Sequence, residues 1–346
     1  MSDIDIIDRL CYHPNMLLNI PRRVRLAAIQ PNCPPPDAQF DCLSPGFNAD
    51  VDAVIDGHVI PLLDTTIDLL LKCADAGADL AVTCEDVTGL CGFLPSDGAF
   101  FDELTERSAA IATQRFAAAA KQRRMRIAAC FGIRERGRNF NATLFFNTDG
   151  HVEGIYRKTH LPPNERWQFT PGQTLDVFEL DIGRVAAAIC YDMMFPECIA
   201  TLARKGAEII VHPTGGMGWY DDIGLATLRV RANDASAYLV TSKNFIHNGA
   251  GHSSIVDPWG HVRADAAFEE NAIVTFDAEL PIRKTQPEWF WQTRMTGVAD
   301  LRQRMATERR PDLYTPLTDT VEALRIPNAA QREKIRGEIR RGECHW

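Results

Sequence analysis

The sequence lacks the features of several protein classes. It has no uninterrupted apolar run of about 18 residues, the length of a membrane-spanning helix. Its net charge of −9 gives no sign of the basic surface that nucleic-acid phosphates require. Residues 1–15 carry acidic side chains and no long apolar core, which is unlike a secretory signal. We therefore expect a cytoplasmic protein that binds neither membranes nor nucleic acids.

Cysteine is present, but not in the patterns of a disulfide scaffold or a metal site. None of the ten cysteines forms a Cys-x-x-Cys pair, and the histidines show no metal-ligand spacing. Several cysteines lie inside apolar runs, where the ordinary interpretation is a small buried side chain in a reducing compartment. We expect no metal and no cofactor.

The pattern of apolar residues predicts one large α/β domain over residues 22–282. The chain has 346 residues and is 45% hydrophobic, enough for a large buried core. Short apolar runs alternate with helical stretches and are interrupted by hairpins, which favours mixed sheets covered by helices in layers. The predicted strands are residues 24–30, 79–83, 126–132, 139–147, 151–156, 177–180, 184–189, 209–212, 238–243, 253–257 and 272–277. Residues 283–346 carry no strand signal and are predicted to be an arm and tail that packs on the domain or on a neighbouring subunit.

Three chemically useful side chains each follow an apolar strand. Glu85, Lys158 and Cys190 stand at the ends of three predicted strands, and Glu165 comes seven residues after the lysine. Taken one at a time, a buried core cysteine and solvent-exposed charges are the more ordinary interpretations. Ligands of open α/β sheets gather outside the strand ends, so the coincidence of three such residues favours a common site.

These residue types match the needs of attack on an amide carbonyl. A thiol becomes a nucleophile when a nearby base or cation favours its thiolate. A carboxylate can carry protons between the thiol, the leaving amine and water. An ammonium can stabilise the oxyanion that forms on the carbonyl oxygen.

The motifs around these residues resemble the nitrilase superfamily of carbon–nitrogen hydrolases. The first glutamate segment is found at residues 85–89, the lysine segment at residues 156–165 and the cysteine segment at residues 189–197. Residues 231–234 and 309–314 are similar to two further family segments. The likeness covers residues 22–317, with the motifs in the family's order and spacing.

This resemblance implies a four-layer αββα sandwich with two mixed sheets and a Glu-Lys-Cys triad. By position, Cys190 would be the nucleophile that forms a thioester acyl-enzyme, and Glu85 the general base and then acid. Lys158 would stabilise the oxyanion together with the backbone N–H of Tyr191. Glu165 would orient the substrate and assist proton transfer. Relatives commonly pair, so a homodimer or a larger homo-oligomer is implied.

Two details of the cysteine segment bear on the substrate. True nitrilases typically have Cys-Trp-Glu at the nucleophile, whereas this chain has Cys190-Tyr191-Asp192, which favours small amides or N-carbamoyl compounds. Met193 and Met194 stand where N-carbamoyl amino-acid hydrolases usually place arginines. We expect these methionines to line a pocket for a neutral or apolar substrate tail; the alternative is that both pack in the core.

Some expectations remain open. His212 and Trp219 are candidate pocket residues, because each follows or lies within a loop near a strand end, but structural roles fit both. A nitrilase proper, which converts a nitrile to an acid and ammonia, is an alternative activity. A catalytically silent member of the family that acts as a binding protein is a second alternative.

Overall fold

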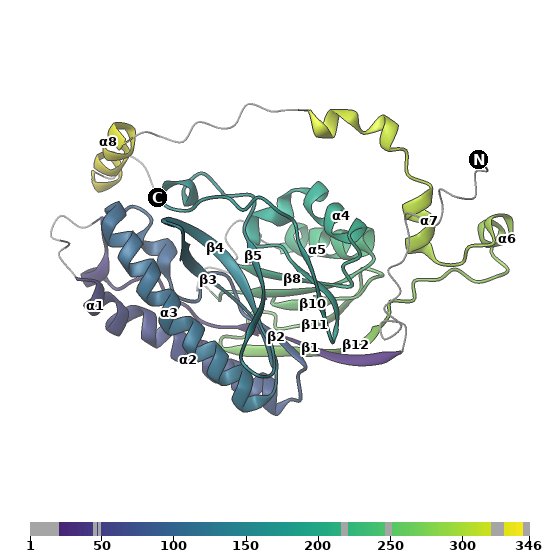
Figure 1. The fold of residues 1–346 in the computed structure, drawn as a ribbon, viewed down its shortest axis with the longest axis horizontal. Helices are drawn as coiled ribbons and strands as arrows, with labels where there is room; N and C mark the ends of the chain where they lie inside the picture. The colour runs from purple at the N-terminus through teal and green to yellow at the C-terminus, as the bar shows by residue number, and fades with distance from the viewer. Residues whose placement is uncertain are drawn as a thin grey trace.

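Two six-stranded sheets face each other in the computed structural model, which describes residues 21–43, 47, 50–215, 221–245, 251–319 and 329–341 (Figure 1). Within each sheet the central strands run parallel and the outer strands antiparallel. The first sheet has the order β12 (Ala272–Leu280), β1 (Arg22–Gln30), β2 (Leu80–Val82), β3 (Arg126–Glu135), β4 (Arg138–Phe146) and β5 (Val152–Arg157). The second has the order β11 (Val262–Asp265), β10 (Ser254–Val256), β9 (Tyr238–Lys243), β8 (Ile209–Thr214), β7 (Gly183–Ala187) and β6 (Val177–Leu180).

Helices cover the outer faces of both sheets, so the predicted αββα sandwich is confirmed (Figure 1). The first sheet is covered by α2 (Ile60–Asp75) and α3 (Gly98–Arg123), and the second by α4 (Pro196–Arg204) and α5 (Asp221–Ala235). The remaining helices are α1 (Val51–Val54), η4 (Ile55–Val59), α6 (Trp291–Thr296), α7 (Leu301–Thr307) and α8 (Ala329–Arg340). Short 3-10 turns are η3 (Ala38–Phe40), η5 (Leu90–Phe93), η6 (Glu165–Trp167), η7 (Cys190–Met194), η8 (Pro311–Leu313) and η9 (Thr315–Thr318).

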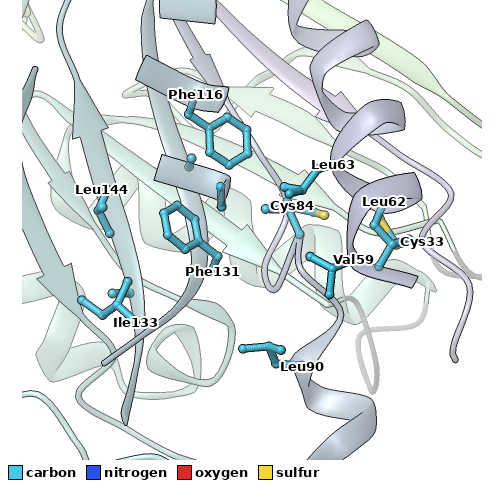
Figure 2. Packing of buried hydrophobic residues seen from close by; sticks show 14 of the residues in the cluster. Cys33, Val59, Leu62, Leu63, Cys84, Leu90, Phe116, Phe131, Ile133 and Leu144 are labelled. Atoms are coloured by element: carbon cyan, nitrogen blue, oxygen red, sulfur yellow. The ribbon is translucent and has the colours of Figure 1, made fainter. Parts of the chain in front are cut away.

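Strand alternation divides the apolar residues among three core layers. In β1, Leu26 and Ala28 point between the two sheets, whereas Ala27 and Ile29 point toward α2 and α3. Figure 2 shows the layer under α2 and α3, where Phe116 packs against Phe131 with ring centroids 5.7 Å apart. A third layer fills the space between the second sheet and α4 and α5. Burial on both faces explains why these strands have near-continuous apolar sequences.

The helix ends follow from local sequence signals. The N-terminus of α3 is capped by Asp97, whose carboxylate accepts from the backbone N–H of Ala99 at 2.8 Å. A glycine cap follows α2, because Gly77 has a φ of +76° two residues after the helix ends. Among the described residues, no helix has the length and apolar character needed to cross a membrane.

One strand was missing from the sequence prediction. The edge strand β11 has only four residues, Val-Arg-Ala-Asp, which are alternately half-buried and exposed. Such a short, charged edge strand gives little apolar signal, because edge strands avoid presenting apolar surface for further pairing.

Candidate active site

Glu85 lies just beyond β2, in a turn whose shape depends on the next residue. Asp86 adopts a positive φ of 55°, and its carboxylate accepts from the backbone N–H groups of Leu90 at 2.9 Å and Cys91 at 2.7 Å. These bonds hold the start of η5. The turn therefore directs the buried Glu85 side chain, which is 6% exposed, to the end of the sheet.

Lys158 and Glu165 occupy the segment that follows β5. The backbone N–H of Lys158 donates to the carbonyl of Asn141 at 2.8 Å, which continues the pairing of β5 with β4. Glu165 begins the 3-10 turn η6, and its backbone carbonyl accepts a hydrogen bond from the backbone N–H of Phe169 at 2.9 Å. The side chains of Lys158 and Glu165 are both buried.

The lysine ammonium bridges the two glutamates. Lys158 Nζ lies 2.7 Å from Glu85 Oε1 and 2.6 Å from Glu165 Oε1. Asn141 Nδ2 donates to Glu85 Oε1 at 2.9 Å, and the backbone N–H of Gly215 donates to Glu85 Oε2 at 2.8 Å. Glu85 thus forms one buried, hydrogen-bonded ion cluster with Lys158 and Glu165, which lie 73 and 80 residues further along the chain.

Cys190 faces this cluster from the second sheet. It starts η7 after β7 with a φ of +44°, a left-handed conformation that is uncommon outside glycine and marks a strained turn. Its thiol lies within hydrogen-bonding reach of the Glu85 carboxylate and of the Thr214 hydroxyl. Unlike most of the described cysteines, Cys190 is only partly buried.

The carboxylate of Asp192 joins the cysteine turn to the lysine segment. Its Oδ1 accepts from Thr159 Oγ1 at 2.9 Å and from His160 at the backbone N–H (2.9 Å) and Nδ1 (2.8 Å). Its Oδ2 accepts from Tyr156 Oη at 2.8 Å and from Ile189 N at 2.9 Å. Asp192 is fully buried. The positions of the thiol and the ammonium are therefore coupled through one side chain.

The pKa values of the two glutamates are shifted in opposite directions. Burial alone would raise the pKa of Glu85, but the Lys158 ammonium and the hydrogen bonds to this carboxylate lower it below its usual value. Burial raises the pKa of Glu165 to about 7, against the opposing effect of Lys158. Although burial opposes the charged ammonium, the Glu85 carboxylate helps to raise the pKa of Lys158 well above its usual value. At neutral pH the cluster therefore contains an ionised Glu85 beside a charged Lys158.

The thiol rests in its neutral form. Burial, and then the negative charge of Glu85, raise the pKa of Cys190 to about 12. The free site therefore stores the proton on sulfur next to a carboxylate that can accept it, which is the arrangement of a nucleophile with its general base.

The remaining predicted site residues, the oxyanion donor and the pocket candidates, lie in different environments. Tyr191 is the second residue of η7, next to the thiol. Met193 is fully buried in the core layer under α4 and α5, whereas Met194 is 52% exposed, so the two methionines do not form one wall. His212 is buried, and burial lowers its pKa to about 4; its Nδ1 lies 3.2 Å from Thr241 Oγ1. Trp219 lies outside the described residues.

Sequence reasoning missed three residues that the structure brings to the site: Asn141, Asp192 and Thr214. Asn141 and Thr214 lie on strands rich in apolar residues, and a polar residue inside such a strand is a usable signal. Asp192 carries no comparable signal, because an acid two residues after a cysteine is ordinary on any surface turn.

One group of side chains near the site has the residue types of a metal centre. Ligand atoms of His160, Asp192 and Cys198 lie within 4.8 Å of one another. Both oxygens of Asp192 are already saturated by five hydrogen bonds. This donor set does not fit a metal ion, and the expectation of a site without metal stays a prediction.

Comparison with known proteins identifies the family. The sequence model of the family described as carbon-nitrogen hydrolase matches residues 58–297. An (R)-stereoselective amidase of Pseudomonas sp. is 32% identical over 220 residues, which cover 62% of this chain and 78% of the relative. An omega-amidase of Danio rerio is 29% identical over 270 residues, which cover 71% of this chain and 88% of the relative.

Solved structures share the fold. A carbon-nitrogen hydrolase from Helicobacter pylori G27 superposes with a TM-score of 0.65 at 20% identity, over 86% of this chain and 99% of the other. An amidase mutant from Nesterenkonia sp. AN1, with the acetamide moiety of fluoroacetamide added covalently at its active-site cysteine, has a TM-score of 0.61 at 18% identity, covering 85% of this chain and 96% of the other. Together with the family match over most of the sandwich, these findings show that the chain is an enzyme that belongs to the carbon-nitrogen hydrolase family.

Proposed function

We propose that this enzyme hydrolyses the C–N bond of a small non-peptide amide through a thioester on Cys190. The observation that carries the proposal is the contact between the thiol of a partly buried cysteine and an ionised carboxylate that is itself bridged to an ammonium. The relatives named above are an (R)-stereoselective amidase and an omega-amidase, which supports an amide rather than a nitrile as the substrate.

The first half-reaction forms the thioester. Glu85 accepts the proton of the Cys190 thiol as the sulfur attacks the amide carbon. The carbonyl oxygen becomes an anion, which the Lys158 ammonium and the backbone N–H of Tyr191 stabilise. When the C–N bond breaks, Glu85 returns the proton to the departing nitrogen, and ammonia or an amine leaves.

The second half-reaction regenerates the thiol. Water attacks the thioester carbon while Glu85 accepts a proton from it, and the C–S bond breaks as the acid forms. The sulfur recovers its proton from Glu85. Glu165, which also contacts the Lys158 ammonium, orients the lysine and assists proton transfer. Asn141 donates to both glutamates and keeps their oxygens in place, with the longer contact to Glu165 Oε2 at 3.4 Å.

A substrate panel with two cysteine variants tests this proposal. We expect the wild type to release ammonia from small amides, and intact-mass analysis to trap an acyl adduct. Cys190→Ala should lower turnover by about 10⁴-fold or more, since it removes the nucleophile. Cys73→Ala, which removes a buried thiol from α2 far along the chain, should retain it.

The other outcomes separate the competing activities. Release of acid from nitriles but not from amides would establish a nitrilase, and activity confined to N-carbamoyl compounds would place the enzyme in that branch. Turnover that survives in Cys190→Ala would remove this residue from the mechanism. A wild type without turnover on any of the three substrate types would favour a silent binding protein.

We also propose a cytoplasmic homodimer or larger homo-oligomer in which residues 283–346 form an arm outside the catalytic domain of residues 22–282. Apolar side chains are exposed on α5 (Ile223 at 77% and Val230 at 50%) and in the arm (Trp289 at 74%). Exposed apolar residues of this kind support a partner surface. All eight cysteines in the described segments are free, which fits a reducing compartment. Light scattering coupled to size-exclusion chromatography measures the oligomer directly.

A further inference from the structure

Lys243 is a buried cation at the end of β9 that the proposed mechanism does not use. Its side chain is 7% exposed, and among the described residues its Nζ makes no hydrogen bond and no ion pair within 4 Å. Asp265, whose charge acts on Lys243, is bonded to Nδ1 of His252 at 2.9 Å instead. Burial accordingly lowers the pKa of Lys243 from its usual value. A largely buried ammonium with no partner among the described residues is costly, and a negatively charged group of a ligand would offset that cost.

The register of the second sheet points this lysine toward the thiol. Lys243 pairs with Thr214 on the neighbouring parallel strand β8, so their side chains emerge on one face about 5 Å apart. The residues two positions earlier, His212 and Thr241, are paired in the same way, and their side chains do meet at 3.2 Å. Since the Thr214 hydroxyl at the end of β8 reaches the Cys190 thiol, Lys243 lies one strand beyond Thr214 along the same sheet edge.

The strand end that carries Lys243 is held firmly. The backbone N–H of Lys243 donates to Ser253 Oγ at 2.8 Å, and the side chain of the next residue, Asn244, bonds to the backbone of Cys33 at both its oxygen (2.9 Å) and its nitrogen (3.1 Å). A cation on such a rigid element is preorganised for recognition.

We propose that Lys243 is a specificity residue that binds a carboxylate on the acyl part of the substrate, so that the preferred substrates are amides of short dicarboxylic acids. This inference rests on the proposed amide hydrolysis. Lys158 is occupied by two glutamates, whereas no carboxylate among the described residues pairs with Lys243. The acyl part stays attached to the sulfur through both half-reactions, so a cation beside it can hold the substrate throughout. A charged acyl part differs from the neutral substrate tail that we expected from Met193 and Met194. Met193 is packed in the core and does not line such a pocket.

Matched pairs of substrates and variants test the charge recognition. Succinamic acid is compared with butanamide, its uncharged counterpart of the same chain length. We expect the wild type to prefer succinamic acid. Lys243→Met should lower kcat/KM for succinamic acid by about 10- to 100-fold, mainly through KM, because a charge-assisted contact is lost. Its kcat/KM for butanamide should stay within about twofold of the wild type, and Lys243→Arg should restore part of the preference.

The outcomes distinguish this inference from the function on which it rests. If Lys243→Met lowers both substrates equally, or if the wild type shows no preference for the acid while hydrolysing butanamide, the carboxylate recognition is wrong and the amidase proposal stands. If the wild type hydrolyses neither amide nor any other in the panel, both proposals fall together. Thermal unfolding of the Met variant verifies that it is folded.

Discussion

At the scale of single residues, Asp192 has a larger role than its place in the sequence suggests. Its carboxylate receives hydrogen bonds from Ile189, just before the thiol, and from Tyr156, Thr159 and His160, which flank Lys158. The Cys190 thiol comes from one sheet and the Lys158 ammonium from the other. Asp192 therefore links two groups of the proposed active site that come from different sheets.

Replacing Asp192 by Asn tests this positioning role. The amide would present a donor to groups that now donate, so we expect the free energy of unfolding to fall by about 2–4 kcal/mol. We also expect kcat to fall by about 10-fold or more, since small displacements of a nucleophile are costly. Denaturant titration and steady-state kinetics measure the two effects.

The matched control for this variant is Glu197→Gln, which changes an exposed acid in the first turn of α4. It should alter neither quantity appreciably, because surface substitutions usually change stability by about 0.5 kcal/mol or less. An Asp192→Asn enzyme with wild-type stability and kcat would show that the five hydrogen bonds do not position the thiol.

Some site residues could be predicted from the sequence because they follow apolar strands, and others could not. Glu85, Lys158 and Cys190 could be proposed as a group because each follows an apolar run. Lys243 also ends an apolar strand, but without the sheet register nothing relates it to the thiol. The role of Asn141 depends on two carboxylates from other segments, and such convergence is a property of the folded chain alone.

At the scale of elements, helix α8 contacts the segment that carries Glu165. Arg336 donates to the carbonyls of Pro95 at 2.6 Å and Ser96 at 2.9 Å, and Arg332 donates to the carbonyl of Trp167 at 2.8 Å. Both guanidinium groups also lie over the Trp167 ring, at 6.0 Å for Arg332 and 5.6 Å for Arg336. The helix thus holds η6 and the loop before α3 together, from a position far along the chain.

Loosening α8 should disturb the site without touching it. We expect the double variant Arg332→Ala/Arg336→Ala to expose the backbone around η6, so that amides in residues 164–169 exchange about 10-fold faster or more. Because Glu165 begins this turn, kcat/KM should fall with it. Hydrogen exchange with mass spectrometry and amide-hydrolysis kinetics measure both.

Lys334→Ala provides the comparison within the same helix, since its side chain is 78% exposed. Exchange and activity should both match the wild type there. Unchanged exchange in the double arginine variant would mean that η6 holds its shape without α8.

The elements differ in how well the sequence predicts them. Strand β9, with six consecutive buried residues, has the predicted bounds, whereas the short edge strand β11 was not predicted. Helix α8 lies within the predicted arm and tail, but its docking depends on carbonyl groups of distant loops. A sequence does not indicate which backbone carbonyl groups will accept hydrogen bonds from a distant helix.

At the scale of the whole molecule, the buried ion cluster links stability to pH. The folded protein binds the Glu165 proton more tightly than the unfolded chain does, because burial raises the pKa of this carboxyl from 4.5 to about 7. As pH rises through this interval, the unfolded chain releases the proton first and gains stability relative to the folded state. The contribution of Glu165 is therefore complete below pH 4.5 and is lost as pH rises through about 7.

Glu165→Gln removes this titration. Between about pH 4.5 and 8, we expect the free energy of unfolding of the wild type to fall by up to about 3 kcal/mol relative to the variant. The lowered pKa of Glu85 acts in the opposite direction, but it is present in both proteins and largely cancels. Denaturant titrations at several pH values provide the difference; parallel curves for the two proteins would contradict the assignment.

The alternation of predicted strands and helices indicated the layered architecture. It did not indicate that the last strand, β12, pairs with the first strand, β1. Strand β12 pairs with β1 in antiparallel register from Arg22 with Leu280 to Gln30 with Ala272. The apolar pattern of either strand is compatible with many neighbours, so its partner is decided by the packing of the entire first sheet.

That closing pair has a consequence for biosynthesis. A ribosome releases β1 early, yet its outer edge has no partner until residues 272–280 have left the exit tunnel. Throughout that time the nascent chain presents a strand with an open hydrogen-bonding edge and apolar faces, the kind of surface that invites aggregation. The late arrival of β12 makes this protein dependent on protection during translation, and a message cut short before codon 272 yields a chain that cannot shield its own first strand.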